Sequence, residues 1–232
     1  MAPVRSYSNW NSRSSDAQPQ IEPFRKYFFI CEGANTETWY FKRLIDNRKN
    51  LNIHSLIELC LLEKTGEDRN ISYPKRLIEF ADQQKDNPEI WFDRNRDKMV
   101  VVFDADIFES KVSDLEALIS EAEKENIVAI TNPAFELFLL LHYEDAYEQD
   151  ILPNEEEIIR NEKNGNQTFI YSLLLKRTGL NSKKNKAIGD LADRVQIAIE
   201  QEKKVNQNIH ECKGRITSNI GKVIEEICKD NG

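Results

Sequence analysis

The sequence predicts an α/β protein with a mostly parallel sheet flanked by helices and a helical extension at the C-terminus. Short apolar runs alternate with amphipathic stretches as far as residue 147, a pattern typical of doubly wound βα units. The run Met99–Phe103 is apolar throughout, as expected for a strand buried on both faces. We therefore expect a flexible arm at 1–22, an α/β core at 23–147 and a mainly helical extension at 148–232.

Each core element follows from a local signal. Strands are expected where short apolar runs end at polar or glycine residues, at 26–31, 56–62, 99–103 and 127–130. Helices are expected after capping residues or prolines, at 37–48, 74–84, 113–126 and from 133 onward. Beyond the core the apolar spacing favours helices at 154–163, 167–178, 187–206 and 216–229.

Composition restricts the classes of function. The chain has 232 residues, with 32 Lys and Arg against 40 Asp and Glu, so its formal net charge is −8. This balance excludes nonspecific coating of nucleic acid or anionic lipid by bulk charge. It leaves room for a nucleic-acid enzyme, because acidic metal ligands can lie beside a local basic surface.

Two charged segments stand out in the extension. Residues 144–163 hold eight acids against Arg160 and Lys163, whereas 176–186 holds five basic residues and no acid. Either segment can simply be solvated surface. The alternative is that the basic stretch contacts a phosphate backbone, and its candidate residues for that contact are Lys183, Lys184 and Lys186.

Cysteine and hydropathy patterns indicate the compartment. The four cysteines form no CxxC pair and the three histidines are scattered, so neither a disulfide framework nor a structural zinc site is expected. No apolar run approaches the roughly 20 residues of a membrane helix, and the N-terminus has no apolar signal core. We expect a cytoplasmic protein without membrane contact.

Acidic residues follow two of the predicted strands. Glu32-Gly33 comes after the first strand, and Asp104 and Asp106 come after the third. Parallel strands end at the same edge of a sheet, where α/β proteins bind ligands. Carboxylates without nearby sulfur or imidazole suit Mg²⁺ or Mn²⁺, so Glu32, Asp104 and Asp106 are the candidate metal ligands. A surface turn is the simpler interpretation of an isolated pair of aspartates.

Further acids lie close to these strand ends. Glu32 is expected to be a third ligand or the general base. Glu37, one turn into the first helix, either completes a second metal site or only favours the helix dipole. Glu136 lies in an apolar helical stretch, so it must be paired or belong to the site. His142, six residues later, is expected to be a structural hydrogen-bonding residue.

Known motifs narrow the choice. No GxxxxGK(S/T) sequence is present, so the chain lacks a P-loop. The aspartate pair follows the third strand, unlike that of haloacid-dehalogenase phosphatases, and no second acceptor domain suggests a glycosyltransferase. A Glu-Gly after the first strand and a DxD after the third resemble a Toprim domain. Over a longer range, the blocks CEGANTETWYF, FDAD and TNPAFELFLLLH resemble the RloB family.

This resemblance covers about residues 26–145, with Thr131 in place of Ser and Phe138 in place of Trp. It implies a Toprim-like fold and a Mg²⁺-dependent nuclease of bacterial anti-phage defence, of the abortive-infection type, acting on tRNA or DNA. It also implies an ATPase partner of the ABC or AAA type, and self-association is left open. The alternatives are a regulatory Toprim-like subunit of such a complex and another Mg²⁺-dependent phosphoryl transferase.

Overall fold

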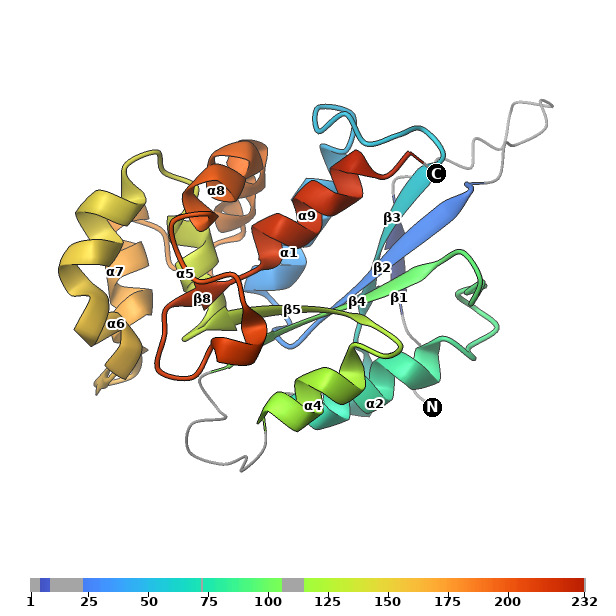
Figure 1. Ribbon diagram of the computed structural model, residues 1–232, viewed down its shortest axis with the longest axis horizontal. Coiled ribbons are helices and arrows are strands. Elements are labelled where there is room, and N and C mark those ends of the chain that lie inside the picture. Colours follow the sequence, from blue (N-terminus) through green and yellow to red (C-terminus); the bar gives the residue numbers. More distant parts are fainter. Residues whose placement is uncertain (1–4, 9–22, 72, 106–114, 232) are drawn as a thin grey trace.

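A computed structural model describes residues 5–8, 23–71, 73–105 and 115–231. Its principal strands are β1 (Arg5–Ser8), β2 (Arg25–Cys31), β3 (Ile57–Glu63), β4 (Lys98–Asp104), β5 (Ile127–Asn132) and β8 (Thr217–Ser218). These six form one sheet in the order β1-β3-β2-β4-β5-β8 (Figure 1). A separate hairpin pairs β6 (Lys163–Asn164) with β7 (Gln167–Thr168).

The four central strands run parallel and end at one edge. Strand β2 pairs with β3 and β4, and β4 pairs with β5, all in parallel. In this register Cys31 lies opposite Val102, and Asp104 lies opposite Thr131. The backbone N–H of Glu32 extends the ladder by donating to Val102 O at 2.9 Å. The acids that follow β2 and end β4 are thereby brought to neighbouring positions.

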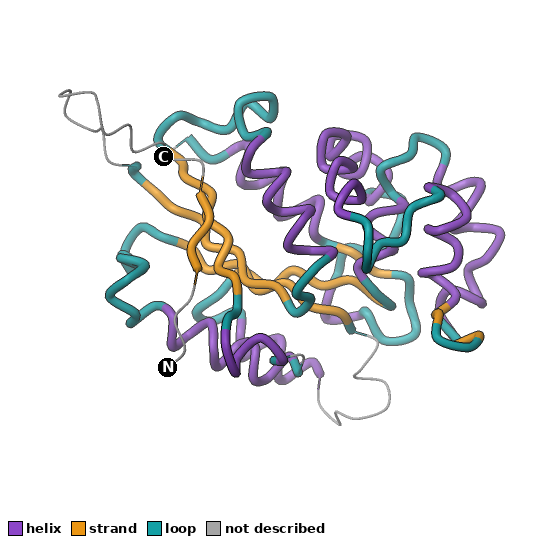
Figure 2. The backbone as a smooth tube through the Cα atoms, turned by 180° about the vertical axis from the view of Figure 1, so that it is seen from behind, coloured by secondary structure: helices purple, strands orange, loops and turns teal. Residues whose placement is uncertain are grey.

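The helices cover both faces of the sheet. They are α1 (Thr36–Asp46), α2 (Pro74–Gln84), α4 (Leu115–Ala122), α5 (Phe135–Leu140), α6 (Glu155–Arg160), α7 (Phe169–Thr178), α8 (Val195–Glu202) and α9 (Ile220–Lys229). Short 3₁₀ or π segments are η1 (Gly66–Asn70), η2 (Tyr147–Ile151), η3 (Leu152–Asn154), η4 (Lys186–Arg194) and η5 (Ile209–Glu211). Figure 2 shows the sheet lying between two groups of helices.

Alternation along the strands explains these two layers. On β2, Phe29 and Cys31 belong to one apolar cluster and Phe28 and Ile30 to the other, because successive side chains of a strand point to opposite faces. The first cluster also contains apolar side chains of α1, α5, α6, α7, α8 and α9. The second contains those of α2, α4 and η5. The α/β class, with a mostly parallel sheet between helices, is thus confirmed.

Helix boundaries follow the predicted signals in the core. Helix α2 begins at Pro74 and ends at Gln84 as expected, because proline lacks the N–H that a first turn leaves unpaired. Helix α4 is shorter than the predicted stretch 113–126, and the proposed capping residue Ser113 lies outside the described residues. None of the helices in the described ranges combines the length and the apolar character that crossing a membrane requires.

Three segments differ from the sequence prediction. Residues 5–8, placed within a flexible arm, form the edge strand β1, antiparallel to β3. Residues 217–218, placed just inside a tail helix, form β8, antiparallel to β5. The predicted helix 187–206 is a 3₁₀ segment followed by the shorter α8. Strands of two to four residues are too short to display the alternation on which sequence recognition depends.

The extension packs directly on the core. Gly189 in η4 lies so close to α1 that a Cβ at this position would approach the carbonyl oxygen of Trp39 to 2.7 Å. Asn219 bridges to β5, where its Nδ2 donates to Val128 O and its Oδ1 accepts from Ile130 N. Residues on both sides of position 147 share one apolar cluster, so the C-terminal residues can supply side chains to the edge of the sheet.

Candidate functional site

A cavity of about 310 Å³ opens at the carboxyl ends of β2, β4 and β5. Its lining includes the predicted site residues Glu32, Glu37, Asp104, Glu136 and Lys183. These residues come from the β2–α1 loop, α1, β4, α5 and the segment before η4. We call this cavity the carboxylate pocket. The parallel register therefore gathers acids that lie up to about a hundred residues apart in the chain.

Glu32 and Asp104 are direct neighbours in the carboxylate pocket. The backbone N–H of Asp104 donates to Glu32 Oε2 at 3.2 Å. The buried Thr131 on β5 donates its hydroxyl proton to Asp104 Oδ1 at 2.7 Å. Position 131 is the one at which the RloB pattern has serine, so the substitution retains the hydroxyl that orients Asp104.

The loop after β2 places Glu37 within the pocket. Gly33 N donates to Glu37 Oε1 at 3.1 Å. A Cβ on Gly33 would come within 1.9 Å of Glu37 Oε2, so any side chain at position 33 would displace the carboxylate. Burial, together with repulsion from Glu136, raises the pKa of Glu37 above its ordinary value. Glu37 thus lies both in the first turn of α1 and in the lining of the carboxylate pocket.

Glu136 is buried and hydrogen-bonded to the extension. Glu136 is 7% exposed. Its Oε1 accepts a hydrogen bond from Ser182 Oγ at 3.0 Å. The carbonyl of Ser182 in turn accepts from Thr36 Oγ1 at 2.9 Å. Ser182 thus connects α5 with the start of α1. Ser182 cannot be identified from the sequence, because no local pattern indicates a partner 46 residues away.

The predicted basic stretch is only partly at this pocket. Lys183 lines it, with its Nζ 5.6 Å from the ring centroid of Tyr171. Lys184 and Lys186 are exposed but are absent from the residues that line the pocket. Arg177, from the same basic stretch, forms ion pairs with acids of the 144–163 segment. Local charge alone could not distinguish a lysine that faces the pocket from its neighbours.

His142 has the structural role that we expected from its position. Its Nε2 lies 2.9 Å from the hydroxyl oxygen of Tyr40, and its Nδ1 lies 3.0 Å from Phe138 O. Both side chains are fully buried in the core. Burial lowers the pKa of His142 to about 4, so the imidazole is neutral at physiological pH. It lies among core aromatic rings and is not one of the residues that line the carboxylate pocket.

The donor chemistry of the pocket fits a hard cation, because its side-chain ligands are carboxylate oxygens. Glu32 and Asp104 are the two predicted ligands that lie within the described ranges. The third, Asp106, lies outside them. Among the described residues, no group of three or more His, Cys, Asp or Glu side chains has the spacing to hold a metal ion by itself.

Comparison with known proteins gives a family. Residues 27–227 match the sequence profile of the RloB family, described as RloB-like protein. Searches among curated proteins and among solved structures gave no match. The matched range contains the sheet edge, the carboxylate pocket and most of the helical extension. The chain therefore belongs to the RloB family.

Proposed function

We propose that this protein is a Mg²⁺- or Mn²⁺-dependent nuclease that hydrolyses phosphodiester bonds in tRNA or DNA. The observation that carries the proposal is the carboxylate pocket, in which Glu32, Asp104 and Glu136 converge with Lys183. Acidic side chains beside one lysine suit a cation and a phosphate together. The family resemblance supports a role in anti-phage defence, in the cytoplasm and beside an ATPase of the ABC or AAA type.

The roles of the acids follow from their surroundings. Glu32 and Asp104, with Asp106, would hold the cation. A bound Mg²⁺ would neutralise the phosphate and stabilise the leaving oxygen. Thr131 fixes the carboxylate of Asp104 through the 2.7 Å hydrogen bond to Oδ1, which keeps that ligand in one rotamer before the ion arrives.

Glu37 and Glu136 also line the carboxylate pocket. Burial raises the pKa of Glu37, and a carboxylate of raised pKa is a better acceptor for the proton of an attacking water. Ser182 holds the Glu136 carboxylate through the hydrogen bond that its hydroxyl donates to Oε1. This hydrogen bond fixes Glu136 near Glu37, where its charge adds to the electrostatic attraction for a cation.

Lys183 provides the positive charge of the pocket. Its ammonium group lies over the Tyr171 ring, and its backbone carbonyl accepts from Asn35 Nδ2 at 3.4 Å. The lysine would pair with a non-bridging phosphate oxygen as negative charge develops there. The same residue was predicted from the basic stretch, whereas Lys184 and Lys186 are better assigned to solvent-exposed surface.

The test compares Glu32→Gln and Asp104→Asn with the wild type. Each variant keeps the shape of the side chain but removes the charge that a cation requires. We expect cleavage of labelled RNA and DNA in Mg²⁺ to decrease by at least about 100-fold, with the melting temperature unchanged. The matched control is Glu79→Gln on the exposed surface of α2, which should cleave like the wild type.

Three results would reject the nuclease assignment. Wild-type cleavage by both variants would show that the pocket acids are not needed. Hydrolysis of nucleotides or small phosphate esters, but of no nucleic acid, by the wild type assayed with a candidate ATPase partner would identify another phosphoryl transferase. Finally, binding of the wild type to that ATPase without turnover of any substrate would identify a regulatory subunit.

A further inference from the structure

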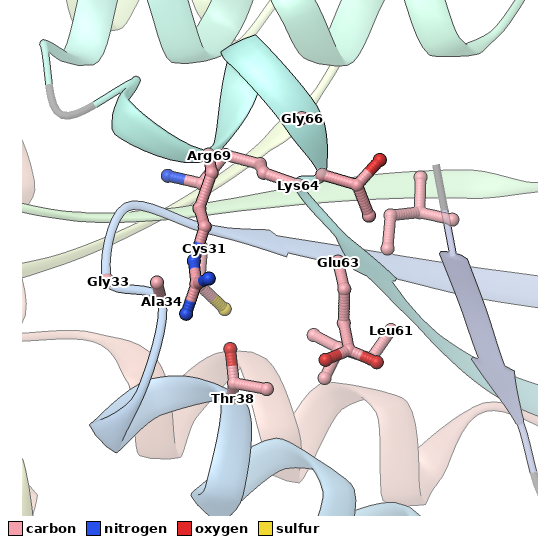
Figure 3. A pocket seen from close by; sticks show the side chains of 11 residues that line it. Cys31, Gly33, Ala34, Thr38, Leu61, Glu63, Lys64, Gly66 and Arg69 are labelled. Atoms are coloured by element: carbon pink, nitrogen blue, oxygen red, sulfur yellow. The ribbon is translucent and has the colours of Figure 1, made fainter. Parts of the chain in front are cut away.

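A second cavity adjoins the carboxylate pocket. Its volume is about 560 Å³, and its lining comes from β2, β3, the start of α1 and η1. Gly33 and Ala34 line both cavities, so the β2–α1 loop is the wall between them. Figure 3 shows this cavity with Arg69 extending from η1 toward Ala34 and Thr38. We call it the Arg69 pocket.

Positive charge dominates the Arg69 pocket. Arg69 is exposed, and within the described ranges it forms no ion pair. Lys64 is half-buried, and burial lowers the pKa of its ammonium group. The acid that lines the pocket, Glu63, is bound to Lys42 at 2.8 Å. The guanidinium of Arg69 is therefore available to an anion from solvent.

The pocket also presents hydroxyl groups. The Oγ1 atom of Thr65 is buried and has no hydrogen-bond partner in the described part of the chain. Thr38, 8% exposed, lines the same cavity, and its hydroxyl points toward Arg69 (Figure 3). Buried polar atoms are nearly always satisfied in native proteins, and a molecule that enters the adjoining cavity is one source of the partner that Thr65 Oγ1 lacks in the described part of the chain. Guanidinium and hydroxyl donors together are typical of phosphate recognition.

Lys64 couples the two cavities. Its Nζ donates to the backbone carbonyl oxygens of Glu32 and Ile71, each at 2.5 Å. The first carbonyl belongs to a proposed metal ligand, and the second lies just beyond η1. Lys64 thus ties the β2–α1 loop, which also lines the carboxylate pocket, to the end of η1. A phosphate bound by Arg69 would contact this same loop.

We propose that the Arg69 pocket binds a phosphate of the substrate strand that flanks the scissile phosphate. This inference rests on the proposed nuclease function and adds to it a second subsite for the nucleic-acid backbone. Arg69 makes the principal charge contact, and the hydroxyl of Thr38, which points toward Arg69, donates to the same phosphate. The subsite holds the strand across the Gly33–Ala34 wall, so that the neighbouring phosphate enters the carboxylate pocket.

The test measures binding of short, labelled single-stranded RNA and DNA to the full chain in EDTA, by fluorescence anisotropy. We expect Arg69→Ala to weaken binding about 10-fold and to lower the slope of log affinity against log salt by about one. Arg69→Lys keeps the charge but loses the bidentate fork, so its affinity should lie between. The control Arg76→Ala removes an exposed charge from α2, outside both cavities, and should bind like the wild type.

A second probe locates the contact on the nucleic acid. Oligonucleotides carrying a single neutral methylphosphonate are compared position by position. Neutralising the flanking phosphate should weaken binding to the wild type, whereas Arg69→Ala should be insensitive to the same change. Equal sensitivity of the two proteins at every position would overturn the proposal, as would wild-type affinity of Arg69→Ala with an unchanged salt slope.

Free phosphate is the other source of the same chemistry. Inorganic phosphate could raise the melting temperature of the wild type but not of Arg69→Ala, while both proteins bind oligonucleotides equally. That result would assign the pocket to a free phosphate and reject the strand contact. If Asp104→Asn lost cleavage while Arg69→Ala bound oligonucleotides like the wild type, the nuclease site would stand and only the phosphate subsite would be rejected. Retained cleavage in Asp104→Asn would reject the proposed nuclease site and leave the binding result to decide the subsite.

Discussion

Two regions of the molecule contain buried or half-buried glutamates, and they differ in the hydrogen bonds that those carboxylates receive. At the junction of α8 and α9, Glu202 is fully buried. It accepts hydrogen bonds of 2.6 to 3.0 Å from Ser218 Oγ, Gly221 N, Lys222 N and Gln207 Nε2. The carboxylate thereby closes the first turn of α9, where backbone N–H groups lack helical partners.

The carboxylate pocket holds its acids differently. Glu37 accepts from Gly33 N and Glu136 accepts from Ser182 Oγ, and both line an open cavity. Burial raises the pKa of Glu37 and of Glu202 alike, so burial does not separate the two regions. The difference is the number of protein donors that each carboxylate receives. A carboxylate surrounded by donors supports the fold, whereas one that borders a cavity can meet a ligand.

The largest expected effect is on stability, and it should differ between substitutions in the two regions. Glu202→Ala leaves several buried donors without an acceptor, so we expect the free energy of unfolding to decrease by about 3 kcal/mol. Glu136→Gln retains an oxygen for Ser182 and should change it by less than about 1 kcal/mol. Chemical denaturation followed by circular dichroism measures both. A larger loss for Glu136→Gln than for Glu202→Ala would reverse the comparison.

The next effect concerns the orientation of Asp104. Thr131→Val removes the hydroxyl that donates to Asp104 Oδ1 while keeping a similar volume. We expect kcat to decrease about 10-fold, which is the usual consequence of losing a group that orients a metal ligand. The control Thr131→Ser keeps the hydroxyl and should retain nearly all activity. Equal activity of the valine and serine variants would show that the hydrogen bond does not matter for the reaction.

A smaller effect is expected within the basic stretch. Lys183 lines the carboxylate pocket, and the adjacent Lys184 does not. Lys183→Ala should therefore weaken nucleic-acid binding by about 5-fold and lower the salt dependence, whereas Lys184→Ala should change the affinity by less than about 2-fold. Binding isotherms at several salt concentrations test this. If the two variants bound with the same affinity, Lys183 would contribute only as an exposed surface charge, as Lys184 does.

These contrasts show what sequence can predict here. The alternation of strands and helices is a local pattern, and it placed Glu32 and Asp104 at one sheet edge. Glu136 can be identified from the sequence because a carboxylate buried in an apolar helix must be paired or belong to a site. By contrast, Ser182 contacts Glu136 across 46 residues and Thr36 across 146. Such partners depend on how the extension packs on the core. Local periodicity in the sequence carries no information about that packing.

The remaining differences have the same origin. The strand Arg5–Ser8 is polar, and it is defined by its pairing with β3 rather than by its own pattern. The strand Thr217–Ser218 has two residues and depends on its contact with β5. Lys183 and Lys184 have the same charge and neighbouring positions, so only the fold distinguishes them. The residues that sequence reasoning missed are those whose role is set by distant parts of the chain.

The smallest expected effect is the pH dependence of stability. The pKa of Glu37 is raised in the folded protein, so the folded state binds this proton more tightly than the unfolded state. The resulting stabilisation is fully present below the ordinary glutamate pKa, and it is lost as the pH rises through the raised value. In EDTA, the free energy of unfolding of the wild type should therefore fall with pH over this window, and that of Glu37→Gln should fall less.

Adding Mg²⁺ then distinguishes Glu37 from Glu202. A cation bound in the carboxylate pocket would favour the charged form of Glu37 and should reduce the pH-dependent difference in unfolding free energy between the wild type and Glu37→Gln. Glu202 lies under its own donors and outside this pocket, so the corresponding difference for Glu202→Gln should not respond to Mg²⁺. Denaturation curves at matched ionic strength measure both differences. If Mg²⁺ left the Glu37 difference unchanged, Glu37 would be an acid that supports the fold, and the distinction between the two regions would fail at this residue.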